Sequence, residues 1–284
     1  MTTAVEIRLL LESDIPAAMQ LKEVAGWNQT EDDWRRLLLL EPHGCFGAIK
    51  NGRLVGTTTT TTYGGDLAWI GMVLVDPQHR RQGIAAQLMN VALTHLNEGV
   101  STVKLDATAL GQPVYERFGF QVESLVERWS GTGNSRAQGG DDRIGVDSDS
   151  LSELLALDQE AFNADRSRLI GELISKTAAT PVLVRDADGA LTGYALARRG
   201  TRANYLGPVV AKDPQQVETL LDQALSQLGD SQVYIDFNRE CAAPTSMLSD
   251  RGFVKERDLI RMCTGRPVAK TSPHVIGIAG PEIG

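Results

Sequence analysis

The chain has 284 residues, of which 42% are hydrophobic and 23% are charged, and its formal net charge is −8 with an isoelectric point near 5.1. This length favours two domains over one, and the acidic charge argues against a nucleic-acid-binding protein, because such proteins attract phosphate with an excess of cationic side chains. No stretch approaches the roughly 18 apolar residues of a membrane span, and the first residues lack the apolar core of a secretory signal. We therefore expect a cytoplasmic protein without a nucleic-acid or membrane partner, and a cationic small molecule or peptide is the more natural ligand.

Two helices are expected near the start of the chain, one over residues 14–24 and one that begins near Thr30. Thr30 and Asp33 fit an N-terminal capping pair, in which each side chain accepts a hydrogen bond from the other residue's backbone N–H. Trp27 and Asn28 lie in the loop between the two helices. A tryptophan in a loop is equally compatible with a ligand contact and with a hydrophobic plug, so the residues alone leave its role open.

The three cysteines, Cys45, Cys241 and Cys263, are far apart in the sequence and have no close Cys or His companion. This pattern predicts neither a disulfide framework nor a zinc site. We expect buried or half-buried thiols, and no metal.

A run of six threonines, residues 57–62, fits a strand whose side chains alternate between two faces. Three of the hydroxyls could point toward a substrate. Threonine is also a favourable strand residue in its own right, and this structural explanation is the preferred one.

The segment LAWIGMVLV, residues 67–75, is a nearly continuous apolar run, which is typical of a strand that is buried on both faces. A basic loop with one glycine follows, and then a helix with Ile84, Leu88 and Leu96 on one face. Backbone N–H groups at a helix start lack partners within the helix, and the helix dipole adds roughly half a positive charge there. With Gly83 allowing close approach and Arg80 and Arg81 adding charge, the loop predicts a pyrophosphate site.

The spacing R-x-x-G-x-A of Arg80, Gly83 and Ala85 resembles the acyl-CoA signature [QR]-x-x-G-x-[GA] of the GNAT acetyltransferase superfamily. The segment PVYERFGF, residues 113–120, is similar to a later motif of the same superfamily, LYEKLGF, and the distance between the motifs suits one strand over residues 102–108. The resemblance extends over about residues 7–129. It implies an α/β fold with a mixed, mostly antiparallel sheet flanked by helices, and transfer of an acetyl group from acetyl-CoA, as a cosubstrate, to an amine.

The resemblance also implies roles for individual residues. The backbone of Val73, Leu74 and Val75 would hold the pantetheine arm, and one of these amides would face the thioester oxygen. The cofactor-binding set continues through the loop and the helix start, with Arg80, Arg81, Gln82, Gly83, Ile84, Ala85 and Ala86 on the pyrophosphate. Thr108 stands where an asparagine often contacts the cofactor in this family, so the sequence departs from the family at that contact.

Tyr115 occupies the tyrosine position of the later motif, and the resemblance implies that it is the general acid. A phenol with a pKa near 10 can donate a proton to a leaving thiolate whose thiol has a pKa of about 8.5. The alternative is a tyrosine that only packs on the sheet. The acceptor side would include Trp27, Asn28 and Glu23, and Glu23, Asp32 and Asp66 are candidates for the base, with none preferred.

The second half of the chain repeats landmarks of the first. Gly189 follows Gly52, and Asp213 follows Asp76, both 137 positions later. The next paired landmarks are Asp106 and Asp236. The stretch from Asp213 to Asp236 is seven residues shorter than the stretch from Asp76 to Asp106, and the missing residues are those of the basic glycine loop. The second half also lacks a counterpart of Tyr115, so we expect it not to bind coenzyme A in the usual way.

These observations predict two tandem GNAT-like domains: residues 1–130 as the acetyltransferase domain, 131–142 as a linker, 143–266 as a degenerate GNAT-like domain, and 267–284 as a tail that packs as an extended segment. The arrangement resembles a bacterial group of tandem GNAT proteins. The predicted activity is an N-acetyltransferase with an unidentified small-molecule or peptide amine as the acceptor, and a homodimer is one role for the second domain. The alternative is a noncatalytic acyl-CoA sensor or scaffold, which would keep the loop and not need Tyr115.

Overall fold

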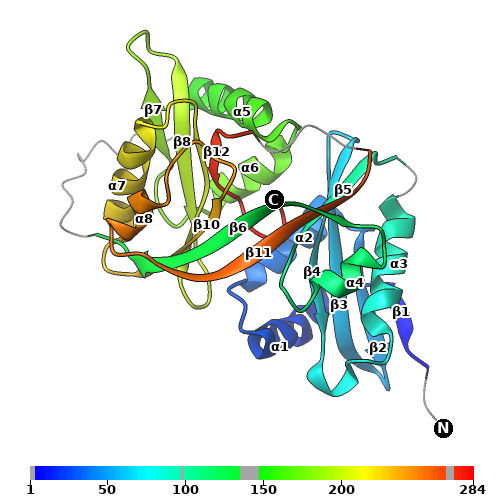
Figure 1. The fold of residues 1–284 in the computed structure, drawn as a ribbon. Coiled ribbons are helices and arrows are strands. Elements are labelled where there is room, and N and C mark those ends of the chain that lie inside the picture. The colour runs from blue at the N-terminus through cyan, green and yellow to red at the C-terminus, as the bar shows by residue number, and fades with distance from the viewer. Residues whose placement is uncertain (1–3, 97–98, 135–146, 267–271) are drawn as a thin grey trace. The chain divides into compact units, whose positions relative to one another are not determined.

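The computed structural model describes residues 4–96, 99–134, 147–266 and 272–284 (Figure 1). The chain divides into two compact units. Unit 1 comprises Met1–Val122, Met262–Val268 and Glu282–Gly284, and unit 2 comprises Glu123–Arg261 and Ala269–Pro281. Each unit thus contains a segment from the other half of the sequence.

Unit 1 is built on a mixed sheet in the order β1-β2-β3-β4-β5-β11. Strands β1 to β4 pair antiparallel, and β4 and β5 pair parallel. The strands are β1 (Glu6–Leu9), β2 (Cys45–Lys50), β3 (Arg53–Tyr63), β4 (Leu67–Val75), β5 (Thr102–Ala107) and the Met262–Gly265 end of β11 (Val254–Gly265). The helices are α1 (Ile15–Ala25), α2 (Glu31–Leu40), α3 (Ile84–Leu96) and α4 (Gln112–Glu116), with short 3-10 turns η1 (Glu12–Asp14) and η2 (Pro77–His79).

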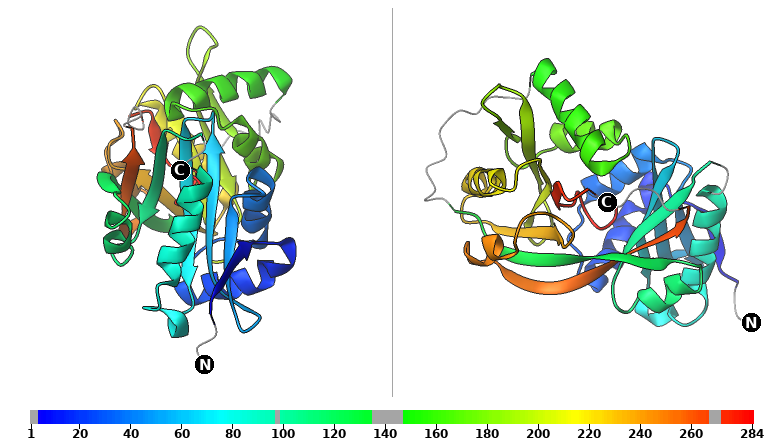
Figure 2. Two further views of the ribbon diagram at one scale, coloured as in Figure 1. Left: turned by 90° about the vertical axis from the view of Figure 1, so that its right-hand side faces the viewer. Right: turned by 45° about the horizontal axis from the view of Figure 1, so that its top comes forward.

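The helices of unit 1 cover both faces of its sheet. Helix α3 packs on β2, β3 and β4, and α1 and α2 also pack against β3. The strands lie between α3 on one side and α1 and α2 on the other (Figure 2). Ile84 and Leu88 of α3 contribute to a buried cluster with Phe46, Ala48 and Val55. The predicted apolar face of this helix therefore forms part of the core.

The local signals for α1 and α2 are confirmed. Helix α1 ends at Gly26, whose φ of 70° is left-handed. At the start of α2, the Thr30 N–H donates to Asp33 Oδ2 at 2.7 Å, and the Asp33 N–H donates to Thr30 Oγ1 at 3.3 Å. This is the expected reciprocal cap, and it fixes the loop that contains Trp27 and Asn28.

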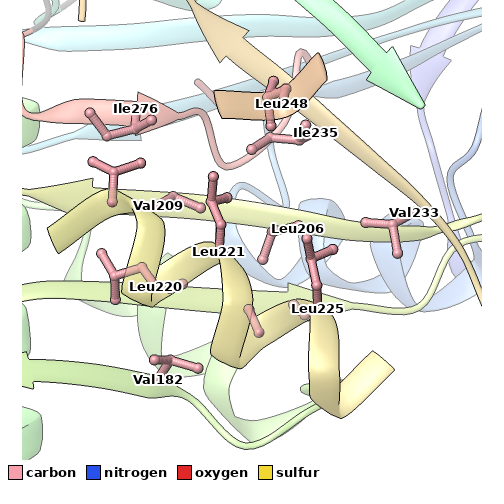
Figure 3. Close-up of a cluster of buried hydrophobic side chains, with 14 of the residues drawn as sticks. Val182, Leu206, Val209, Leu220, Leu221, Leu225, Val233, Ile235, Leu248 and Ile276 are labelled. Atoms are coloured by element: carbon pink, nitrogen blue, oxygen red, sulfur yellow. The ribbon is translucent and has the colours of Figure 1, made fainter. Parts of the chain in front are cut away.

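Unit 2 is built on a sheet in the order β11-β6-β10-β12-β9-β8-β7. Its strands are β6 (Gln121–Thr132), β7 (Val182–Arg185), β8 (Leu191–Arg198), β9 (Asn204–Ala211), β10 (Gln232–Asn238), most of β11 and β12 (Val275–Gly277), and its helices are α5 (Ser148–Phe162), α6 (Ser167–Ser175), α7 (Gln216–Leu228) and α8 (Ser246–Ser249). Leu220, Leu221 and Leu225 of α7 pack on Val209 of β9 and Val182 of β7 in the core of this unit (Figure 3). Unit 2 therefore has its own hydrophobic core.

The two halves follow the same order of elements. The run β2-β3-β4-α3-β5-α4-β6 is matched by β7-β8-β9-α7-β10-α8-β11. The hairpin glycines that the sequence pairs, Gly52 and Gly189, have φ values of 74° and 86°. The repeat and the mixed, mostly antiparallel α/β architecture are thus confirmed.

The last strand of each half lies in the sheet of the other unit. Strand β6, from the first half, pairs antiparallel with β10 in unit 2, with Ile235 opposite Trp129. The end of β11, from the second half, takes the place next to β5 in unit 1. The sequence did not predict this exchange. The predicted linker 131–142 begins inside β6, which runs through Thr132, and residues 135–142 lie outside the described residues, as do residues 267–271 of the predicted tail.

Candidate functional site

Strand β4 carries a bulge in the middle of unit 1. Leu74 lies opposite Thr57, and Gly71 lies opposite Thr59, so that Met72 and Val73 together face one residue of β3. Met72 has a left-handed φ of 49°, and its carbonyl accepts a hydrogen bond of 2.7 Å from Thr57 Oγ1. A bulge bends a strand and changes the direction of its backbone groups.

Strand β4 and strand β5 are paired only at their beginnings. The parallel register runs from Leu67 opposite Thr102 to Trp69 opposite Lys104 and ends there. The following β4 residues, including Val73 to Val75, lie beyond this ladder. Their backbone groups on the β5 side are therefore positioned to pair with an extended ligand, as in strand addition to a sheet edge.

The turn after β4 is held by short-range hydrogen bonds. Asp76 Oδ1 accepts from the Gln78 N–H at 2.8 Å, and Arg80 Nε donates to the Val75 carbonyl at 3.2 Å. Lys50 Nζ donates to Gln82 Oε1 at 2.8 Å. This loop therefore has a defined backbone path, while its residues from Arg80 to Gly83 are exposed.

The chain enters α3 through two left-handed residues, Arg81 with φ 60° and Gly83 with φ 79°. Among the described residues, none except its two chain neighbours has an atom within 4 Å of the position a Cβ would take at Gly83. Ile84, the first residue of α3, is buried, and Ala85 and Ala86 are half-buried. The first-turn N–H groups of a helix have no acceptor within it, so this open approach leads to a site suited to an anion.

Tyr115 lies on α4, with its ring in edge contact with Phe120 at a centroid separation of 6.2 Å. Burial raises the pKa of its hydroxyl to about 12, so Tyr115 is a neutral proton donor at physiological pH. Within the described part of the chain this hydroxyl has no hydrogen-bond partner. Thr108 is used locally, because its Oγ1 accepts from the Gly111 N–H at 3.2 Å.

The three carboxylates considered as bases are all exposed and engaged elsewhere in unit 1. Glu23 accepts from Lys22 Nζ at 2.7 Å, and Asp32 forms an ion pair of 3.5 Å with Arg35. Asp66 accepts from the hydroxyl of Ser101 at 3.2 Å. Nothing in these contacts distinguishes one of them as a base.

The loop between α1 and α2 contains two polar residues that are more buried than Trp27. Trp27 is half-buried, and its carbonyl accepts from Lys22 Nζ at 3.4 Å. Asn28 and Gln29 are both buried. Gln29 was not among the predicted site residues, although its side chain makes one of the longest-range contacts in the unit.

That contact is with Glu282, at the end of the chain. Gln29 Nε2 donates to Glu282 Oε2 at 2.8 Å, and the Tyr63 hydroxyl donates to the Ile283 carbonyl at 2.6 Å. The sequence indicated only that this tail packs on something, because its Gly- and Pro-punctuated apolar residues have no periodicity. The structure places Glu282–Gly284 in unit 1.

The corresponding region of unit 2 lacks these features. Residues 212–215 connect β9 to α7, and the Gln215 N–H is bonded to Asp213 Oδ1 at 2.9 Å. Glu218 lies in the first turn of α7, where it opposes an anion. Helix α8 and its flanking residues contain no tyrosine.

The described residues contain neither a candidate metal site nor a membrane-spanning helix. Among the described residues, no group of three or more His, Cys, Asp or Glu side chains could hold a metal ion. No helix in the same residues is long and apolar enough to cross a membrane.

Comparison with known proteins identifies both halves. Residues 12–120 match the acetyltransferase (GNAT) family, and residues 154–277 match an acetyltransferase (GNAT) domain. The chain is 27% identical to the uncharacterized N-acetyltransferase YitH of Bacillus subtilis over 258 residues, which is 88% of each protein. Its fold is similar to that of a proposed acetyltransferase from Pyrococcus horikoshii, with a TM-score of 0.83 and 21% identity over 99% of this chain and 96% of that one. It is also similar to a tandem GNAT protein from the clavulanic acid biosynthesis pathway, with a TM-score of 0.65 and 16% identity over 94% of this chain and 100% of that one. The chain therefore belongs to the GNAT acetyltransferase family, as a tandem GNAT protein and an acyltransferase enzyme.

Proposed function

We propose that unit 1 transfers an acetyl group from acetyl-CoA to a primary amine of a small molecule or peptide by direct attack. The observation that supports this most strongly is the stretch of β4 that has no ladder with β5 and leads into the exposed loop and the start of α3. The pantetheine arm of acetyl-CoA would extend along Val73 to Val75, and the pyrophosphate would lie on residues 80–86. An extended arm and a charged diphosphate fit these two adjacent features in that order.

The chemistry follows from this placement. The amine nitrogen attacks the thioester carbonyl carbon, and a β4 amide near Val73 donates to the oxygen on which negative charge develops. The C–S bond then breaks, and the departing sulfur takes a proton from the neutral hydroxyl of Tyr115. The attacking nitrogen loses one proton to solvent as the amide forms, and Tyr115 regains its proton from solvent. The raised pKa of that hydroxyl keeps it protonated until this step. No enzyme nucleophile is needed, because both substrates are held together.

Unit 2 would not bind acetyl-CoA in this way. It lacks the glycine loop, its α7 begins with an acidic turn, and it offers no tyrosine at the position that corresponds to Tyr115. We expect one acetyl-CoA per chain.

The proposal is tested by acetyl-CoA binding and by thiol release with a panel of primary amines. Calorimetry should give one site per chain, and the double variant Arg80→Ala/Arg81→Ala should bind at least about tenfold more weakly, since two charge-assisted contacts to phosphate are removed. Arg53→Ala removes an equally exposed arginine from the β2–β3 hairpin and should bind as the wild type does. No thiol release with any amine, or unchanged binding by the double variant, would contradict the proposal.

A further inference from the structure

Gly71 and Glu282 lie against each other in unit 1. A Cβ atom at Gly71 would lie 2.5 Å from the Glu282 carbonyl oxygen and 2.8 Å from its Cα. Both atoms belong to the backbone, which has no flexible end that could move aside. Only a glycine on β4 allows the tail to pass this close to the strand.

The tail is held in this place by buried polar contacts. Glu282 is 3% exposed, and its carboxylate accepts from Gln29 Nε2 at 2.8 Å. One residue later, the Ile283 carbonyl accepts from the buried Tyr63 hydroxyl at 2.6 Å. These contacts fix the last residues of unit 1 against the α1–α2 loop and β3.

The face of the sheet beneath the tail contains polar groups that are not satisfied by the protein. In the β3–β4 ladder, Thr59 lies opposite Gly71 and Thr61 lies opposite Trp69, so these threonines share the face on which Gly71 meets the tail. Their hydroxyl oxygens are buried and have no hydrogen-bond partner in the described part of the chain. The same holds for Oε1 of Gln29, on the amide that binds Glu282.

These groups share one property: each offers oxygen lone pairs. The two threonine hydroxyls, the Gln29 amide oxygen and the Glu282 carboxylate form an acceptor-rich set. An ammonium group has three N–H donors and no acceptor, so it complements such a set better than an anion or a neutral apolar group does. The negative charge of the whole chain acts in the same direction.

The location fits the transfer site. Gly71 is two residues before Val73 on β4, so their Cα atoms lie no more than about 7 Å apart, the reach of two extended residues. We propose that the tail is part of the acceptor site and that Glu282 binds a cationic group of the acceptor, which makes the enzyme selective for amines that carry a second positive charge. This inference rests on the proposed function of unit 1, and it adds a substrate class to it.

The test is a binding measurement, so that it does not depend on turnover. Enzyme saturated with coenzyme A is titrated with 1,4-diaminobutane and with 4-amino-1-butanol, which differ in the second ammonium group. The wild type should bind the diamine at least about tenfold more tightly, and Glu282→Gln should lose that preference, since a charge-assisted contact becomes a neutral one. Glu12→Gln, which neutralises an exposed glutamate of unit 1, should keep the preference.

Two further measurements separate the possible failures. Coenzyme A should bind Glu282→Gln as tightly as wild type, and Thr61→Val, which keeps the strand shape and removes one acceptor, should weaken diamine binding about threefold to tenfold. Equal binding of the two amines by the wild type, or an unchanged preference in Glu282→Gln, would overturn the inference. Selective diamine binding without any thiol release would instead contradict the proposed function and leave the role of Glu282 standing.

Discussion

The hydroxyl of Tyr63 donates a 2.6 Å hydrogen bond to the carbonyl of Ile283, a residue 220 positions away in the sequence. Both residues are buried in unit 1. This bond and the one between Gln29 and Glu282 fasten the last residues of the chain to the strand and loop next to the predicted acetyl-transfer site.

Tyr63→Phe should lower the free energy of unfolding by about 1 kcal/mol, because the buried Ile283 carbonyl loses its donor. Urea denaturation measures this change. Tyr115→Phe is the matched control in the same unit, since the Tyr115 hydroxyl has no partner in the described residues and its removal should leave the unfolding free energy unchanged. An equal loss in both variants would argue against the tail contact.

Tyr115→Phe should instead lower kcat by about 10²-fold or more, as expected for removal of a general acid. Its binding of acetyl-CoA should match that of the wild type. Steady-state kinetics with calorimetry separate the two effects. A variant with wild-type kcat would reduce Tyr115 to a packing residue.

The pKa of Tyr115 leads to a prediction about how activity and stability depend on pH. Burial raises the pKa of Tyr115 from 10.0 to about 12 in the folded protein. Because the pKa of Tyr115 is higher in the folded than in the unfolded chain, its neutral hydroxyl contributes to the free energy of unfolding. This contribution is fully present below pH 10 and is lost as the pH rises from 10 toward 12. The activity should therefore show no loss from Tyr115 ionisation between pH 7 and 9, and Tyr115→Phe should be less sensitive than wild type to alkaline unfolding above pH 10. A Tyr115 absorbance change near pH 8, measured as a difference between wild type and variant, would contradict this.

Gly83→Ala and Gly52→Ala form a second matched pair. Both glycines have left-handed φ values, 79° and 74°, and both have open space around them, so each substitution should cost about 1 kcal/mol of stability. Only Gly83→Ala should also weaken acetyl-CoA binding, by about tenfold or more, because its methyl group would lie where the pyrophosphate approaches the backbone. Calorimetry on both variants checks the difference, and equal affinities would remove residue 83 from the predicted binding loop.

Gly71→Ala should displace the tail, since the new methyl group would overlap the Glu282 backbone. We expect a lower kcat/KM for the amine together with increased cleavage of the tail by protease. Gly171→Ala in α6 meets no atom within 4 Å and should leave both readouts unchanged while slightly stabilising its helix. A Gly71→Ala enzyme with a protected tail and normal kinetics would show that β4 tolerates the contact.

The elements that could be predicted from sequence are those with local signals. The apolar run of β4, the glycine loop after it and the Thr30–Asp33 cap each depend on residues a few positions apart. The resemblance to the GNAT superfamily implied the fold class, and landmarks that recur 137 positions later indicated the tandem repeat. The two halves carry the same pattern twice. This similarity predicts two domains of one fold, but it does not show that β6 and β11 each lie in the sheet of the other unit. Neither β6 nor β11 carries a local signal that identifies its neighbouring strand, so their pairing is set by tertiary structure.

The residues of the proposed acceptor site were harder to predict from the sequence. Glu23, Asp32 and Asp66 were considered because they are acidic and near the expected side, yet all three are exposed in the fold. Glu282 was missed because it is separated from Gln29 by 253 residues, and no periodicity links a short tail to a particular strand. The one available signal was Gly71, a glycine within an otherwise bulky strand, where close approach of another backbone is a common cause.

The central claim is that the loop after β4 and the start of α3 in unit 1 hold the diphosphate of acetyl-CoA. A crystal structure of the protein soaked with coenzyme A tests it most directly. We expect the diphosphate within hydrogen-bond distance of the backbone N–H groups of Gly83 to Ala86, with the pantetheine arm beside Val73 to Val75. Coenzyme A bound at the β9–α7 connection of unit 2, or absent from the loop of unit 1 in crystals where it is otherwise bound, would rule out this binding site.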